Sequence, residues 1–290
     1  MINKKIGLLQ ISTLTFFLTI TSFILFSSNI IKISKNDTII SIIIGSILSL
    51  LIFKFILLLR KKNKITNKLN KTFITVILTT FFIYLLINVT NFIKVSFLSD
   101  GNFYSIIILI FLTTLIISNQ GYKEVASLSL ILSFIFIPLF IINIYGSTKS
   151  LDLTYLTPIF TNNIIDIIKS SLLFTFYITI PLLLLLFIPY NEIDNEKKQD
   201  KYLYLAFSIG ILTIIIDYLL LYFSCNIEII TSYKYPFMLV INSLSSFLIF
   251  NRFSYIISFY LLFSPFITLS LILTIIRQLG LNKYILKIQD

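Results

Sequence analysis

The feature that most constrains this chain is a series of apolar runs, about twenty residues long, that recurs along its whole length. A helix of about 20 apolar residues spans the ~30 Å hydrocarbon core of a bilayer. Backbone N–H and C=O groups find no water there, so each run must be helical. We therefore predict an all-α integral membrane protein, with residues 1–290 as a single polytopic domain. Nine helices are expected, near 7–27, 38–59, 72–93, 103–118, 125–145, 164–188, 202–224, 236–250 and 254–276.

The composition supports a lipid environment. Hydrophobic residues make up 57% of the chain and charged residues 12%, against about 45–50% and about 25% in soluble domains. A water-soluble globule would have too few polar residues to cover its surface. The sequence has no histidine, the commonest general base and metal ligand. It also shows no glycine-rich phosphate loop and no paired catalytic carboxylates, so we expect no enzyme, no cofactor and no bound metal.

The net charge of +11 does not indicate a nucleic-acid partner, because the basic residues flank the apolar runs. In that position they indicate topology and contact with the lipid bilayer. The segments on the N-terminal side carry 13 Lys and Arg residues and the interhelical segments on the other side carry 5. This asymmetry predicts a cytoplasmic N-terminus. Nine helices then place the C-terminal tail outside, although that tail carries Arg277, Lys283 and Lys287.

The first apolar run is interpreted as a membrane span and not as a signal peptide. Lys4 and Lys5 precede it, as in a secretory signal. The run from Ile6 to Phe26 is, however, longer than the apolar region of a typical signal, and no A-x-A-like cleavage site follows it.

Asp217 lies within the seventh expected span. An ionisable residue near the middle of a bilayer costs about 2.5–3.5 kcal/mol on insertion scales, so it needs a partner or a wet cavity. One hypothesis makes it a functional intramembrane charge. The alternative is a protonated side chain that serves helix packing alone.

Proline and polar residues mark a second candidate site. Pro181 interrupts the sixth span, close to Tyr177 and Thr179, and removes one helix hydrogen bond. This pattern indicates either a plain kink that Thr179 satisfies or an interrupted helix that binds a substrate. Other spans contribute polar side chains that serve either as packing contacts or as the lining of a central cavity. The candidate ligand-binding residues are Thr19, Thr21, Ser22, Tyr84, Asn88, Tyr177, Thr179, Pro181 and Asn242.

The first span has a polar middle that includes Thr19, Thr21 and Ser22, and the sixth span contains Pro181. These two weak points occupy corresponding positions in a five-plus-five inverted repeat. Such repeats place the binding site between the two interruptions. We expect the first repeat over about 7–145 and the second over about 164–276.

Four short motifs resemble those of the spore germination permeases, the integral-membrane B-subunits of germinant receptors in the amino acid–polyamine–organocation transporter superfamily. The similarity covers nearly the whole chain. It rests on the order and spacing of the motifs: the first helix from Ile11-Ser12 to Ile24-Leu25, Asn119-Gln120-Gly121-Tyr122-Lys123-Glu124, Leu156-Thr157-Pro158, and Lys234-Tyr235-Pro236 followed by Asn251-Arg252-Phe253.

The resemblance implies a transporter-like fold of ten helices, of which this chain is expected to lack the tenth. It implies a subunit that binds a small nutrient germinant and triggers germination together with the other receptor subunits. An amino acid is the expected germinant. Two alternatives remain open: a secondary amino-acid or cation transporter and a non-transporting membrane scaffold. The expected location is the bacterial cell membrane or the spore inner membrane.

Overall fold

The computed structural model describes residues 5–285, apart from 62–67, 149–150, 159 and 244–257. Within these ranges every named element is a helix, and the sole β contact is an isolated bridge between Ile6 and Ile193. The α-helices are α1 (Leu8–Ser34), α2 (Thr38–Lys61), α3 (Lys68–Ser96), α4 (Phe103–Ser118), α5 (Tyr122–Ser147), α6 (Ile164–Leu182), α7 (Glu196–Ser224), α8 (Ile227–Ser232), α9 (Phe237–Ser243) and α11 (Tyr260–Ile285). The 3₁₀ helices are η1 (Lys35–Asp37), η3 (Leu153–Leu156), η4 (Leu183–Phe187) and η5 (Tyr190–Glu192).

The helices are long and apolar enough to identify a multi-pass membrane protein. Among the described residues, six helical stretches meet the length and hydropathy of a span: Ser27–Lys61, Lys71–Ser96, Tyr122–Ser147, Ile164–Phe187, Lys198–Ser224 and Tyr260–Gly280. Two shorter apolar helical stretches, Leu8–Thr21 and Phe103–Ser118, accompany them. The predicted count of nine is therefore not confirmed. Of the expected eighth span, 236–250, residues 244–250 lie outside the described residues.

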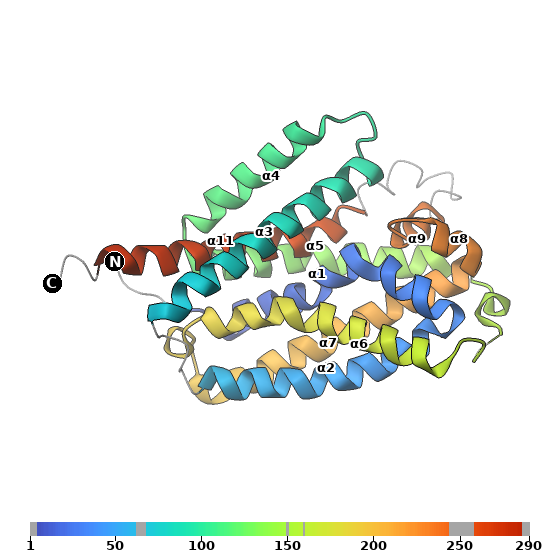
Figure 1. Cartoon of the computed structure of the whole chain (residues 1–290), viewed down its shortest axis with the longest axis horizontal. Coiled ribbons are helices and arrows are strands. Elements are labelled where there is room, and N and C mark those ends of the chain that lie inside the picture. The colour runs from blue at the N-terminus through green and yellow to red at the C-terminus, as the bar shows by residue number, and fades with distance from the viewer. Residues whose placement is uncertain (1–4, 62–67, 149–150, 159, 244–257, 286–290) are drawn as a thin grey trace.

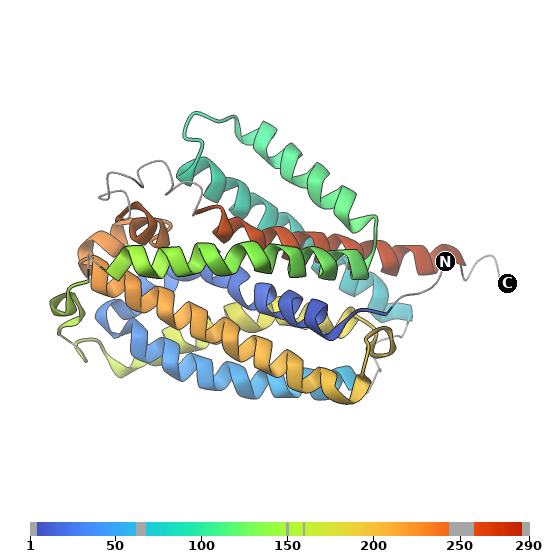
Figure 2. The ribbon, with the colours of Figure 1, turned by 180° about the vertical axis from the view of Figure 1, so that it is seen from behind.

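Helix α1 is at the centre of the bundle. It packs against α2, α5, α6, α7 and α11, whereas α4 lies at the periphery beside α3 and α11 (Figures 1 and 2). Its core-facing side chains include Leu14, Phe17 and Leu18, which are fully buried. The expected weak point in this helix is not a break, because α1 is one continuous helix of 27 residues.

Small residues allow α2 and α6 to pack closely. A Cβ on Gly45 would come within 2.7 Å of the Phe174 ring and of the Ser171 carbonyl oxygen on α6. The Thr175 hydroxyl donates to the Gly45 carbonyl at 3.0 Å, and Ser170 donates to Ser41 at 2.6 Å. Small residues and hydroxyl bonds are typical of helix interfaces in membranes, where burial of apolar surface gives no driving force.

At the end of the bundle where α1 begins, the chain segment between α6 and α7 is held from two sides. The backbone of Ile6 accepts from Asp194 at 2.9 Å and donates to the Glu192 carbonyl at 2.7 Å. The buried Arg60 guanidinium, at the end of α2, donates to the Ile188 carbonyl at 3.3 Å from Nη2 and to Gln199 Oε1 at 3.3 Å from Nη1. We call this the N-terminal end of the bundle.

Helix α11 runs from the opposite end back to the N-terminal end. Near its start, Phe259 stacks on Phe97 at the end of α3, with 5.4 Å between ring centroids. Near its other end, Arg277 Nη1 donates at 2.6 Å to Asn119 Oδ1, in the turn between α4 and α5. That turn lies at the N-terminal end, since Gln10 of α1 donates to Ser127 near the start of α5. The basic Arg277 thus lies on the N-terminal side.

We expect Gly45→Ala to lower the free energy of unfolding by about 1–3 kcal/mol, the usual cost of overpacking a tight interface. The added methyl group would meet the backbone of α6, which has little freedom to move. The measurement is thermal or denaturant unfolding of the purified protein in detergent. Gly280→Ala is the control, because nothing lies within 4 Å of its Cβ position. Equal stability of the parent and Gly45→Ala would contradict the described α2–α6 contact.

We also expect Gly280 and Gln120 to face the same side of the membrane, and Glu228 to face the other side. Single cysteines at these three exposed positions, introduced into Cys225→Ser, are to be labelled with a membrane-impermeant maleimide before and after permeabilisation. The native Cys225 is removed because it would add background, although burial raises the pKa of its thiol. Labelling of Gly280→Cys from the side that labels Glu228→Cys would overturn the path of α11.

Candidate functional site

A cavity of about 160 Å³ lies between α1, α3 and α6. Eight side chains line it, and none of them carries a formal charge. The lining residues are Thr21, Phe81, Tyr84, Leu85, Phe176, Tyr177, Ile180 and Pro181. The cavity has the character of a small-molecule site, which is concave and mostly apolar with a few polar groups that fix orientation.

The central helix α1 contributes Thr21 to the lining of the cavity. The Thr21 side chain is fully buried, and its hydroxyl bonds to the Phe17 carbonyl oxygen at 2.9 Å. The same hydroxyl lies 2.6 Å from the Thr268 hydroxyl on α11, where either oxygen is able to donate. Thr21 therefore joins the wall of the cavity to α11.

Helix α6 changes its geometry just after Pro181. The α-helix includes Pro181, ends at Leu182 and continues as the 3₁₀ helix η4. Pro181 has no N–H to donate to the carbonyl four residues earlier. The Thr179 hydroxyl donates to the Thr175 carbonyl oxygen at 2.8 Å. It does not donate to the carbonyl of Tyr177, the one for which Pro181 has no N–H. The helix thus continues through Pro181 without a break and changes to 3₁₀ geometry beyond Leu182, beside the cavity.

Two tyrosines bring phenol groups to this cavity. Tyr177 accepts a hydrogen bond from Asn29 Nδ2 at 3.3 Å, which links α6 to α1. Tyr84 comes from α3, and its backbone carbonyl accepts from Asn88 Nδ2 at 2.8 Å. The two hydroxyl groups and Thr21 are the polar groups of an otherwise apolar lining.

Of the nine predicted ligand-binding residues, the structure brings four together around the cavity: Thr21, Tyr84, Tyr177 and Pro181. Two others point elsewhere. Thr19 packs against Gly210 of α7, where a Cβ would lie 2.9 Å from it, and Thr179 is buried within its own helix. Asn88 lies one turn from Tyr84 without lining the cavity. The side chains of Ser22 and Asn242 lie outside the described residues.

Asp217 belongs to a separate buried group. It lies on α7 about two turns before the end of that helix, with 6% of its surface exposed, and it interacts electrostatically with Tyr260 of α11. The Tyr260 hydroxyl accepts from Asn143 Nδ2 of α5 at 3.2 Å. The one ion pair in the described part of the chain is Lys61–Asp200, so no lysine or arginine described there neutralises Asp217.

Sequence reasoning missed Asp37, which organises the end of the bundle opposite to the N-terminal end. Its fully buried carboxylate accepts from the backbone N–H of Phe160, and from the N–H and Nδ2 of Asn162 at 2.9 and 3.0 Å. Tyr222 reaches the same turn from α7, donating to the Lys35 carbonyl at 2.6 Å. Asp37 thus fixes the entry of α6 against the turn between α1 and α2. The available sequence signal was an acidic residue directly before a span.

The long segment before α6 has its own cap. Asp152 accepts from the Thr154 hydroxyl at 2.7 Å and from the Thr154 N–H at 2.9 Å. These bonds, the hydroxyl bond first, hold the pKa of the Asp152 carboxyl below its usual range. The cap begins η3, which contacts α7.

The long apolar helices define the class of this chain as a multi-pass membrane protein. The family model described as spore germination protein matches residues 5–290. The chain therefore belongs to the spore germination protein family. A comparison with curated proteins found no match.

Proposed function

We propose that this protein is the integral-membrane subunit of a germinant receptor and that it binds a small nutrient in the cavity between α1, α3 and α6. One observation carries the proposal: four of the predicted ligand-binding residues, which come from three helices, line the same cavity. Pro181, which lies one residue before the end of α6 and its change to the 3₁₀ helix η4, is one of the residues that line this cavity.

The dimensions and chemistry of the cavity favour a small ligand with an apolar part. A cavity of roughly 150 Å³ holds benzene, so 160 Å³ accommodates an amino acid with a modest apolar side chain. The rings of Phe81 and Phe176 form apolar walls, while the hydroxyls of Tyr84 and Tyr177 provide hydrogen bonds for polar groups of the ligand.

The proposed setting follows from the family and from the charge distribution. The N-terminus is placed in the cytoplasm by the positive-inside asymmetry. The membrane is the bacterial cell membrane or the spore inner membrane, and the protein acts there with the other germinant-receptor subunits. Binding is converted into a signal for germination through these partners.

The inverted repeat is proposed in a modified form, in which α6, α7 and α11 are the counterparts of α1, α2 and α3. Part of the pattern of contacts supports this correspondence, whereas the extensive α1–α11 contact has no equally extensive α6–α3 counterpart in the described part of the chain. If each helix is replaced by its counterpart, the α2–α6 contact becomes the α7–α1 contact, and the structure contains both. The α1–α6, α2–α7 and α3–α11 contacts convert into themselves, and all three are present.

We expect a nutrient amino acid to raise the thermal stability of the purified protein, and Leu85→Phe to abolish that rise. A ligand at 100 times its Kd stabilises a protein by about 2.7 kcal/mol, and the larger ring at position 85 would narrow the cavity and obstruct the ligand. A screen of amino acids and sugars by thermal shift in detergent is the measurement. Ile83→Phe is the matched control, because Ile83 lies on the same helix and is half exposed.

The receptor role is tested in spores that lack this protein. A normal response of such spores to every nutrient, with no compensating paralogue, would contradict it. A ligand that stabilises Leu85→Phe as well as the parent would instead show that the binding site lies elsewhere. If no amino acid or sugar stabilises the parent, the alternative of a non-transporting scaffold is favoured.

Asp217 supports a second candidate function, secondary transport of an amino acid or a cation. A buried carboxyl without a basic neighbour in the described part of the chain is suited to carry a proton, and such residues mark ion pathways in membrane proteins. Its separation from the cavity residues distinguishes it from a direct ligand contact.

We expect Asp217→Asn to abolish coupled uptake into proteoliposomes if the protein is a transporter, and to leave ligand-induced stabilisation intact. The amide keeps the shape of the side chain but cannot release a proton. Uptake is to be measured with and without a pH gradient. Undiminished coupled uptake by the variant would exclude Asp217 as the coupling group, and absence of uptake by the parent would favour the receptor.

A further inference from the structure

A groove of about 480 Å³ opens on the outside of the α2–α7 pair, near the N-terminal end of the bundle. Its charged lining comprises Lys54, Lys61, Asp200 and Lys201, and Leu58 and Tyr204 belong to its apolar part. It is separate from the cavity between α1, α3 and α6 and shares no residue with it.

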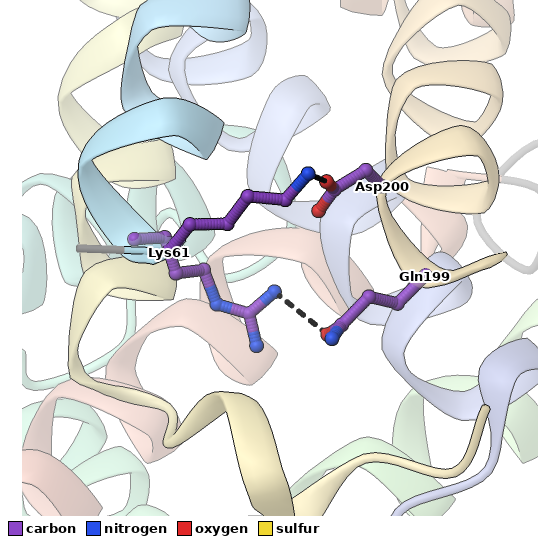
Figure 3. Close-up of polar contacts among 4 residues, drawn as sticks. Lys61, Gln199 and Asp200 are labelled. Carbon is purple, nitrogen blue, oxygen red and sulfur yellow. Dashed lines mark hydrogen bonds and ion pairs between the residues drawn. The ribbon is translucent and has the colours of Figure 1, made fainter. Parts of the chain in front are cut away.

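The charges in this groove do not cancel. Lys61 Nζ forms an ion pair with the Asp200 carboxylate (Figure 3). Among the described residues neither Lys54 nor Lys201 has an acidic partner, since Lys61–Asp200 is the one ion pair found there. The groove therefore has two positive charges that no described carboxylate neutralises, beside a third that is already paired.

The neighbouring Arg60 does not compete for a ligand in this groove. Its guanidinium is buried on the inner side of α2 and is engaged by the Ile188 carbonyl and by Gln199. Gln199 and Asp200 are consecutive residues of α7, and Figure 3 shows Lys61 directed at Asp200 on that helix. Arg60 thus contacts the interior of the protein, and Lys61 faces the groove.

The depth of the lysines matches a lipid headgroup. Lys54 lies seven residues before Lys61 on α2, about 10 Å deeper along the helix at 1.5 Å per residue, so its ammonium group must extend back towards the membrane surface. The exposed α2 side chains beside it are apolar: Leu51, Phe55 and Leu58 are all more than half exposed. A ligand in this groove meets positive charge at the membrane surface and an apolar helix face below it.

We propose that this groove is a binding site for an anionic phospholipid of the leaflet at the N-terminal end. The headgroup phosphate lies between Lys54 and Lys201, and one acyl chain follows the exposed apolar face of α2. Charge complementarity identifies the headgroup, and the apolar continuation below the lysines favours a lipid over a soluble anion. Basic pockets between membrane helices bind anionic headgroups by this combination. The site is independent of the proposed germinant site.

The test is a titration of the purified full-length protein in detergent with phosphatidylglycerol, followed by native mass spectrometry, with phosphatidylcholine as the zwitterionic reference. Lys54→Gln combined with Lys201→Gln is expected to weaken phosphatidylglycerol binding by about 25-fold, since each basic residue near a membrane surface contributes about fivefold. Lys54→Arg with Lys201→Arg keeps both charges and is expected to retain binding.

The matched control is Lys71→Gln combined with Lys123→Gln, which removes the same charge at the starts of α3 and α5, away from the groove. An equal loss in this control, or no loss in the groove variant, would show non-specific attraction and overturn the proposal. Inorganic phosphate is expected not to displace the lipid. Full displacement by millimolar phosphate would make the groove a site for a soluble anion and would also overturn it.

Discussion

The requirement that α1 satisfy its polar groups without water determines much of this structure. The helix is enclosed by α2, α5, α6, α7 and α11, so its buried threonine hydroxyls bond to protein partners, whereas the buried Ser27 hydroxyl has none among the described residues. Thr15, Thr19 and Thr21 each donate to the carbonyl four residues earlier, at 2.8 to 2.9 Å. Their side chains are then able to lie fully buried against neighbouring helices. Gly210 of α7 is able to approach Thr19 closely because it has no Cβ, which would lie 2.9 Å from the Thr19 side chain.

The helical class could be predicted from the sequence because the constraint behind it is local. Each apolar run has to form its own backbone hydrogen bonds in lipid, whatever its neighbours are. The fourth expected span, 103–118, coincides with α4, and α2 over Thr38–Lys61 begins where 38–59 was expected. Asp37 could not be placed in this way, since its partners Phe160 and Asn162 are more than 120 residues distant in the chain.

In the candidate site, too, locally determined features could be predicted and features that depend on distant contacts could not. Pro181 could be predicted because a proline acts on its own helix, and the change to η4 follows it directly. Thr19 and Thr21 were indistinguishable in the sequence, yet Thr21 lines the cavity and Thr19 faces Gly210. Thr19 and Thr21 are two residues apart, so their side chains point about 200° apart around the helix axis, at 100° per residue. Which of them faces the cavity depends on the packing of α1 against five other helices.

The described part of the segment between α7 and α11 shows a second kind of environment for an apolar run. It leaves α7 at the end opposite to the N-terminal end, and α11 begins at that same end, where Phe259 stacks on Phe97. The apolar residues of α9 pack on the bundle, as Phe237 does against Tyr218 with ring centroids 5.1 Å apart. A run of apolar residues requires an apolar environment, and another helix provides it as well as lipid does.

Helix α11 connects the two buried features on which the proposed functions depend. Thr268 contacts Thr21 in the wall of the cavity, and Tyr260, two turns earlier on the same helix, interacts with Asp217. A ligand that displaces Thr21 therefore acts on the helix that also contacts the buried carboxyl. In the proposed receptor, this connection would transmit occupancy of the cavity along α11 to the turn at Asn119, to which Arg277 donates at the N-terminal end. In a transporter the same helix would couple the ligand to a proton on Asp217.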